Sequence, residues 1–334
     1  MKKMKKVLAV LLCVAMIAGV AAGCGSNGST PKEKATLNVV ALKGPTGMGL
    51  VKLMADNEAG ETAVNYNVEL VGAADEITGK IVNGEVDIAA VPCNLASVLY
   101  NKTNGAVKMA AVNTLGVLYI LEVNGGETIQ SVADLNGKTI VSTGKGTTPE
   151  YILNYILKAN GIDPETDVNI EYKSEANEVA ALVQQGGADI VMLPQPMVTT
   201  VMAKTEGVRV ALDMTEEWAK AQGEDGTQLV TGTVIVRSDV LENNQEAVDT
   251  FLKEYEASIN YINENVAEGA DLVVKYEIIP AAPIAQKAIP ACNMVFMSGA
   301  EMQQSVAAYL GVLADANPAS VGGNVPDDNF YYLP

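Results

Sequence analysis

Two stretches of the chain repeat the same order of short apolar runs and amphipathic segments. Each begins with an apolar run, at residues 37–42 or 139–143, of a length typical of a buried strand. A turn rich in Gly and Thr follows, and then a helical segment, a second strand, a second helix and a third strand that ends in proline. The pattern therefore predicts βαβαβ twice. Strands separated by helices favour a largely parallel sheet in each copy.

A direct comparison of the two stretches supports this prediction. When 37–105 is placed on 139–207 without a gap, 15 of the 69 positions are identical. The identical pairs include Gly84 with Gly186, at the predicted helix ends, and others that fall at equivalent structural signals. Common ancestry of two similar lobes explains these matches better than chance.

The segments that follow each copy connect the lobes. The apolar stretch 107–123 can leave the first lobe, and the β-branched stretch 228–237 can return the chain to it. From residue 242 the pattern is mostly helical, and we expect helices at 245–265, 271–276 and 298–313 to pack on the first lobe. Two crossing segments predict a hinge with a cleft beside it.

The domain boundaries follow from these crossings. Lobe 1 is predicted to consist of 37–121 plus 231–334, and lobe 2 of 122–230. The fold class is therefore α/β, with two lobes that each contain a mainly parallel sheet flanked by helices.

The first residues have the pattern of an export signal. A lysine-rich start precedes a short apolar run, and small residues lead to Cys24. This junction resembles a bacterial lipobox, so we expect a signal peptide at 1–23 and a lipid on Cys24. The polar stretch 24–36 then serves as a flexible tether. The chain is predicted to be anchored on the extracytoplasmic face of the bacterial cell membrane. An ordinary signal peptide with an incidental cysteine is the alternative.

Composition excludes several kinds of function. The chain has no histidine, which removes His-based nucleophile pairs, imidazole bases and His-ligated metals. The formal net charge of −18 argues against a nucleic-acid partner. The only arginines are Arg209 and Arg237, so a site with several arginines around an anion is not expected. We expect no metal, no cofactor and no catalytic residues.

Two further sequence features have simple interpretations. Cys93 and Cys292 remain after the signal region, and free, buried thiols are preferred over a disulfide between them, although the sequence does not decide this. The segments 144–147 and 137–139 look like pieces of a nucleotide-binding loop. Neither has the glycine that this motif requires four positions before its Gly-Lys pair.

The order of these features resembles type II periplasmic binding proteins, the solute receptors of ABC importers. The residues that carry the likeness are the Gly-Glu-Val-Asp-Ile-Ala run 84–89, its echo at 186–191, and the stretch 131–140. Within that family the chain is most similar to the NMT1/THI5-like branch, which contains nitrate, sulfonate, taurine and thiamine-pyrimidine receptors. The resemblance implies a Venus-flytrap fold and a small-molecule solute that is delivered to a membrane permease. We expect a monomer.

The ligand is expected beyond the carboxyl ends of the strands, where loops and helix starts converge. The repeat nominates the loops after the first and third strands of each copy, and the crossing segments add three positions. The candidate ligand-binding residues are Gly44, Pro45, Thr46, Gly47, Met48, Pro92, Cys93, Asn94, Asn113, Thr114, Gly144, Gly146, Thr147, Thr148, Tyr151, Gln195, Pro196 and Thr231. Glycines permit close backbone approach, and Asn94 and Gln195 offer both a donor and an acceptor.

The sequence leaves the ligand and part of the function open. A small polar organic solute is expected, with a pyrimidine-like heterocycle and an alkylsulfonate as alternatives. A lipoprotein that senses a ligand for a signalling partner is an alternative to an importer receptor. A pyrimidine-synthase enzyme of the NMT1-like fold is a third hypothesis. The family uses histidine and iron for that chemistry, and this chain has no histidine.

Overall fold

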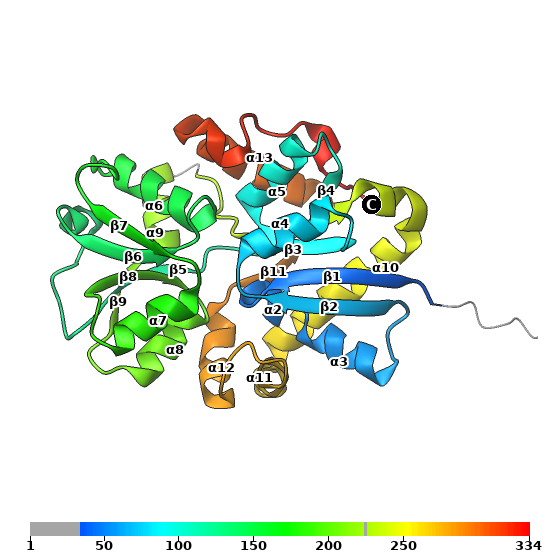
Figure 1. Cartoon of the computed structure of the whole chain (residues 1–334), viewed down its shortest axis with the longest axis horizontal. Helices are drawn as coiled ribbons and strands as arrows, with labels where there is room; N and C mark the ends of the chain where they lie inside the picture. Colours follow the sequence, from blue (N-terminus) through cyan, green and yellow to red (C-terminus); the bar gives the residue numbers. More distant parts are fainter. Residues whose placement is uncertain (1–33, 224–225) are drawn as a thin grey trace, which may run out of the picture. The chain divides into compact units, whose positions relative to one another are not determined.

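The computed structural model describes residues 34–223 and 226–334, and Ala35–Pro334 form one compact unit. The predicted signal peptide, most of the predicted tether and Cys24 lie outside the described residues. The unit contains two mixed sheets, each flanked by helices (Figure 1). The α/β fold class predicted from the repeat is confirmed.

The first sheet has six strands in the order β11-β4-β10-β3-β1-β2. Its strands are β1 (Thr36–Leu42), β2 (Asn65–Val71), β3 (Ile88–Pro92), β4 (Val107–Thr114), β10 (Gly232–Arg237) and β11 (Met294–Met297). The three strands of the repeat, β1, β2 and β3, pair in parallel. β10 runs antiparallel to β3 and β4, so the crossing segments make this sheet mixed.

The second sheet repeats this arrangement with five strands in the order β7-β6-β8-β5-β9. Its strands are β5 (Leu118–Glu122), β6 (Thr139–Thr143), β7 (Asn169–Lys173), β8 (Ile190–Pro194) and β9 (Arg209–Asp213). β6 pairs in parallel with β7 and β8, whereas β5 is antiparallel to β8 and β9. Each lobe thus has a parallel core of three strands with antiparallel additions.

Helices cover both faces of each sheet (Figure 1). The repeat supplies α2 (Pro45–Met48), α3 (Val51–Ala59), α4 (Ala74–Val82) and α5 (Cys93–Lys102) in the first lobe, and α6 (Thr148–Ala159), α7 (Ala176–Gln184) and α8 (Met197–Lys204) in the second. The remaining helices are α9 (Met214–Gln222), α10 (Ser238–Glu264), α11 (Val266–Lys275), α12 (Ala282–Ala288) and α13 (Gly299–Ala316). No helix in the described part of the chain is long and apolar enough to cross a membrane.

The chain changes sheets first at 115–117, between β4 and β5. This is a few residues before the predicted boundary at 121, because β5 belongs to the second sheet. A Cβ at Gly116 would lie 2.1 Å from the hydroxyl of Thr215, so only glycine fits at this crossing. The second crossing precedes β10, and its Thr231 N–H donates to the carbonyl of Thr114 at 3.0 Å. The two crossings are therefore hydrogen-bonded to each other.

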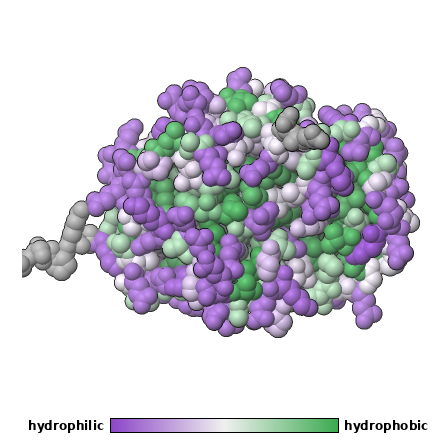
Figure 2. Space-filling model, turned by 180° about the vertical axis from the view of Figure 1, so that it is seen from behind, coloured by the Kyte–Doolittle hydropathy of each residue, from purple (hydrophilic) through white to green (hydrophobic). Residues whose placement is uncertain are grey.

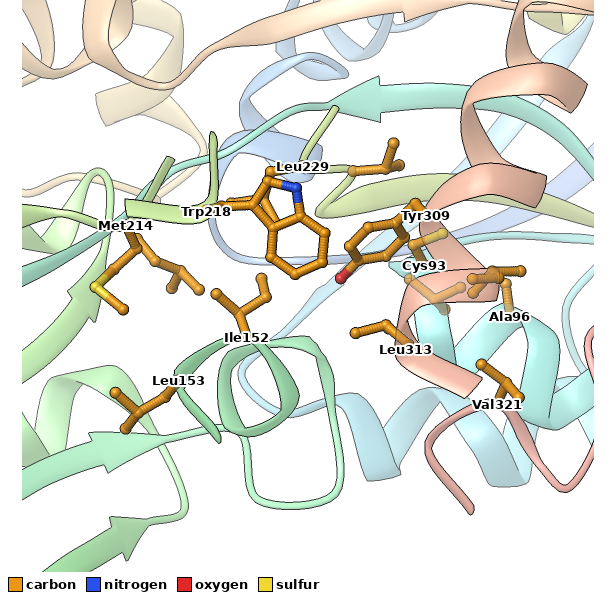
Figure 3. Close-up of a cluster of buried hydrophobic side chains, with 14 of the residues drawn as sticks. Cys93, Ala96, Ile152, Leu153, Met214, Trp218, Leu229, Tyr309, Leu313 and Val321 are labelled. Atoms are coloured by element: carbon orange, nitrogen blue, oxygen red, sulfur yellow. The ribbon is translucent and has the colours of Figure 1, made fainter. Parts of the chain in front are cut away.

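The last long helix is not confined to the first lobe, which corrects the expectation for 298–313. α13 contacts both α5 of the first lobe and α6 of the second. Figure 3 shows Tyr309 of α13 beside Trp218 of the second lobe, with Cys93 of the first lobe close by. The ring centroids of Trp218 and Tyr309 are 5.5 Å apart, and both side chains are buried. One apolar cluster thus extends across both lobes. Sequence periodicity identified the helix but not its second packing partner.

Both cysteines predicted to be free are free and buried. Burial raises the pKa of the Cys93 and Cys292 thiols, so both remain protonated. Cys93 lies in the cluster of Figure 3, whereas the Cys292 sulfur is 3.8 Å from that of Met48. Their role is packing, as preferred from the sequence.

Polar side chains dominate the margins of the surface in Figure 2, and apolar side chains are gathered towards its middle. Fully buried residues form two clusters around the first sheet, one of which continues into the second lobe, and a third within the second lobe. These cores hold the strand ends in place on either side of the space between the lobes.

Candidate functional site: the interlobe cleft

A cavity of about 580 Å³ lies between the two sheets, at the carboxyl ends of their parallel strands. Its walls are formed by segments that follow β1, β2 and β3 in the first lobe and β6, β7 and β8 in the second. This is the position at which open α/β sheets bind ligands. The volume lies within the ordinary range for a small-molecule site.

More than half of the candidate ligand-binding residues line this cavity. The structure places there Gly44, Pro45, Thr46, Pro92, Thr114, Gly144, Thr147, Thr148, Gln195, Pro196 and Thr231. Thr46 and Thr148 occupy equivalent positions in the two repeats, and both are buried. The duplicated pattern has therefore placed two threonines on opposite sides of one cavity.

Four candidate residues lie behind this lining instead. Gly47 and Met48 are buried in α2, where Met48 packs into the core of the first lobe. Cys93 lies in the interlobe apolar cluster. Asn113 is only 1% exposed, and its side-chain oxygen accepts from the Thr114 hydroxyl at 3.1 Å. Helix and strand periodicity turns the side chains of Met48, Cys93 and Asn113 away from the cavity.

Asn94 is also outside the lining, because it connects the two lobes. Its amide nitrogen donates to the carbonyl of Ser320 at 3.1 Å and, at 3.5 Å, to that of Gly146. Its oxygen accepts from the Thr148 hydroxyl at 3.0 Å. Asn94 is fully buried, so these bonds satisfy a side chain that water cannot reach.

The remaining candidates, Gly146 and Tyr151, lie beside the cavity but do not line it. Gly146 has a φ of +76°, which glycine adopts without strain. Its N–H donates to the carboxylate of Glu150 and its carbonyl faces Asn94. Tyr151 is partly buried, and burial together with the nearby Glu150 raises the pKa of its hydroxyl. These two residues shape the start of α6.

Sequence reasoning missed the loops after the second strand of each repeat. The starts of α4 and α7 line the cavity through 72–74, Glu76 and 174–177. The signal was available, since β2 and β7 are parallel to the strands whose carboxyl ends were nominated. Gly232, Glu277 and Ile278 also line the cavity. No sequence pattern marks Glu277 or Ile278, because the segment between α11 and α12 is brought there only by the fold.

Two polar groups in the lining have no protein partner among the described residues. Gln195 is only 5% exposed, and its oxygen accepts from the N–H and the hydroxyl of Thr199 at 3.3 and 2.9 Å. These two bonds fix the amide, and its nitrogen has no protein acceptor. The Thr231 hydroxyl is buried without a hydrogen-bond partner. The Gln195 amide nitrogen is open to the cavity and can donate to a bound molecule, whereas the Thr231 hydroxyl is enclosed by the protein.

The floor of the cavity tolerates little added bulk at Gly232. A Cβ there would lie 2.4 Å from the side-chain oxygen of Asn113, 2.9 Å from Thr46 and 3.0 Å from Thr114. Glycine is therefore required where the second crossing approaches the floor.

The ionisable groups of the lining are mostly acidic. They are the four glutamates Glu69, Glu76, Glu175 and Glu277 and the single lysine Lys43. All five are exposed at the rim, whereas the deeper lining is neutral. Among the described residues, no group of three or more His, Cys, Asp or Glu is arranged to hold a metal ion.

A second cavity, of about 530 Å³, lies at the opposite end of the second sheet. Its lining includes Glu122 and Asp189 and none of the candidate residues. Burial raises the pKa of Glu122, but bonds from Thr128, Ile129 and Arg209 outweigh it and lower the pKa to about 2. With these bonds made, Glu122 is a satisfied structural anion.

Residues 59–287 match the model of a family described as "ABC transporter, phosphonate, periplasmic substrate-binding protein". The chain belongs to this family. The match begins in the first lobe, spans the whole second lobe and ends in α12. The location that the family implies is extracytoplasmic, with a small-molecule ligand and a membrane permease as partners.

Solved structures of low sequence identity share the fold. An ABC transporter protein from Parabacteroides distasonis is 20% identical with a TM-score of 0.72, over 90% of this chain and 99% of that one. The periplasmic aliphatic sulphonate binding protein SsuA from Escherichia coli is 18% identical with a TM-score of 0.70, over 90% and 93%. Both confirm the type II periplasmic-binding-protein fold predicted from the sequence.

One curated relative matches a shorter stretch. The YtlA protein of Bacillus subtilis (strain 168), whose name calls it a binding protein, is 22% identical over 149 residues. The match covers 45% of this chain and 42% of that protein.

Proposed function

We propose that this chain is the solute receptor of an ABC importer, which captures a small polar organic solute in the interlobe cleft and delivers it to the permease. The observation that carries the proposal is the cavity at the carboxyl ends of the parallel strands of both sheets, which the amide of Gln195 lines. The family membership supports the same activity. The protein acts by binding and is not an enzyme.

The proposal includes the placement of the protein in the cell. The mature chain is a monomer held on the extracytoplasmic face of the membrane by lipid on Cys24. Radiolabelled palmitate should be incorporated into the wild type and into Cys93→Ser, and not into Cys24→Ser. Label on Cys24→Ser would exclude this anchor.

Solute capture is tested on the purified mature protein. A bound solute should be released on unfolding and detected by mass spectrometry, and its return should raise the melting temperature of the emptied protein. The solute should be recovered chemically unchanged after prolonged incubation. A converted product would contradict the assignment as a receptor, as would a broad screen in which no compound binds.

A further inference from the structure

We propose that Thr199 is a positioning residue for solute binding, which fixes the Gln195 amide so that only its nitrogen faces the interlobe cavity. At this point the cleft then selects a solute atom that accepts a hydrogen bond. The inference rests on the proposed function and adds to the same site a residue that does not itself line the cavity. Three observations support it: the donors of Thr199, the backbone bond that holds Gln195, and the comparison between the two repeats.

Thr199 determines which end of the Gln195 amide faces the cavity. Its backbone N–H and its hydroxyl both donate to the Gln195 side-chain oxygen, at 3.3 and 2.9 Å. A backbone N–H can only donate, so an amide nitrogen in that place would set two donors against each other. The oxygen is therefore directed at α8, and the nitrogen is left on the side of the cavity that Gln195 lines.

The backbone of Gln195 is held independently of its side chain. Its N–H donates to the carbonyl of Val117, in the first crossing between the lobes, at 2.9 Å. The residue is also buried, which restricts its side chain further. Because both ends of the residue are held, the amide loses little conformational freedom when a solute binds, and its donor is available at a small entropic cost.

The equivalent hydroxyl of the first repeat has a different partner. Ser97 occupies the position that corresponds to Thr199, and its hydroxyl donates to the carbonyl of Val321 at 2.8 Å. Val321 belongs to the 3-10 helix Pro318–Val321, which lies against α5. A hydroxyl at this position thus bonds to whatever lies against the helix start. In the first lobe that is the covering segment, and in the second lobe it is the amide of the cavity lining.

A fixed amide nitrogen favours some solute atoms over others. It can donate to an oxygen of a phosphonate, a sulfonate or a carbonyl, but it has no lone pair for an N–H or an ammonium group in the same place. An amide that rotated freely would present its oxygen or its nitrogen and would bind either kind of atom. The preference for an acceptor therefore depends on the bonds from Thr199, and it is compatible with the substrate named in the family's description.

The orientation of the amide is tested on the mature, ligand-free protein by NMR, with glutamine labelled at its side-chain nitrogen. Gln195→Ala identifies the Gln195 signals by their loss. We expect these signals to be rigid on the nanosecond timescale in the wild type and in Thr199→Ser, and clearly more mobile in Thr199→Val, which keeps the shape and removes the hydroxyl. Thr250→Val removes a hydroxyl that donates to a backbone carbonyl within α10, and it serves as the matched control.

The effect on binding is measured by titration calorimetry with ethylphosphonate, with ethanesulfonate, and with the solute that mass spectrometry identifies in the freshly purified protein. Thr199→Val should weaken binding about three- to tenfold, the effect of one hydrogen bond, and Thr199→Ser should restore it. In a Gln195→Ala background, Thr199→Val should change affinity little, because Thr199 acts through that amide. Gln195→Glu keeps an acceptor for Thr199 but turns a second acceptor to the cavity, so it should weaken binding more than Gln195→Ala.

The outcomes separate this inference from the proposed function. Unchanged affinity in Thr199→Val, or Gln195 signals as rigid as in the wild type, would overturn the inference and leave the receptor function intact. An equal loss of affinity with and without the Gln195 amide would also overturn it, because Thr199 would then act on the fold. If Thr199→Val does not fold, Thr199→Ala removes the same hydroxyl and replaces it in each comparison. Failure of every probe to bind, with no released solute, would count against the receptor function and with it this inference.

Discussion

The loops after the third strands of the two repeats occupy equivalent positions in the sequence, but one has a structural role and the other lines the cavity. In the first lobe, the residues after β3 start α5 and place Asn94 in a buried hydrogen-bond network between the lobes. In the second, the residues after β8 start α8 and place Gln195 in the cavity lining. The backbones are related by the repeat, but the first loop reaches the cavity only through Pro92, whereas the second lines it from Pro194 to Met197.

The difference arises from what covers each loop. The start of α5 is covered by α13 and by the 3-10 helix Pro318–Val321, whose carbonyls accept from Asn94 and from Ser97. The second repeat has no such cover at α8, which contacts α12 instead. A duplicated sequence thus determines where polar loops converge, and the chain added outside the repeat determines which of them remain accessible.

The largest effect is expected from removing the aromatic contact between Trp218 and Tyr309, which lies next to the covered start of α5. Trp218→Ala should lower the free energy of unfolding by about 4 kcal/mol, because a large buried side chain is replaced by a cavity. Chemical denaturation followed by circular dichroism measures the change. Trp218→Phe retains a ring against Tyr155 and Tyr309 and should lose clearly less. Equal losses would show that ring packing does not join the lobes.

A direct comparison of the two loops comes next. Asn94→Ala should destabilise the protein by about 3 kcal/mol, because it leaves buried groups of Ser320 and Thr148 unpaired. Gln195→Ala should cost about 1 kcal/mol or less, since it removes only the bonds from Thr199. Gln195→Ala should reduce the free energy of solute binding by more than it reduces the free energy of unfolding. Similar losses of stability in the two variants would contradict the division of roles.

A smaller effect on stability is expected from Glu122, at the end of the second sheet opposite the interlobe cavity. Glu122→Gln should lower the free energy of unfolding by about 2 kcal/mol at pH 7, through weakened bonds to Arg209 and Thr128. The pKa of Glu122 lies at about 2, below the ordinary value of 4.5, so its stabilisation is present above pH 4.5. It is lost as the pH falls towards 2.

Urea unfolding at several pH values checks this prediction. The gap in stability between wild type and Glu122→Gln should narrow as the solution is acidified from pH 4.5 towards 2. Glu127→Gln changes an exposed glutamate in the adjacent loop and is the control. A gap that stays constant over this range would show that Glu122 is not held ionised by its partners.

The sequence alone determined the duplicated βαβαβ pattern, the crossing segments and the end of each sheet at which ligand loops gather. These features depend on local periodicity and on the repeat, and Thr46 and Thr148 were found because strand and turn patterns are local. Tertiary structure decided the rest. Asn94 was removed from the lining by α13 and the 3-10 helix, and Glu277 was brought into it by the packing of α11 and α12. The bond from Asn94 to Ser320 joins residues 226 positions apart, and α11 and α12 are held by distant partners, α3 and α8. Hydrophobic periodicity states that a face is buried without naming what covers it.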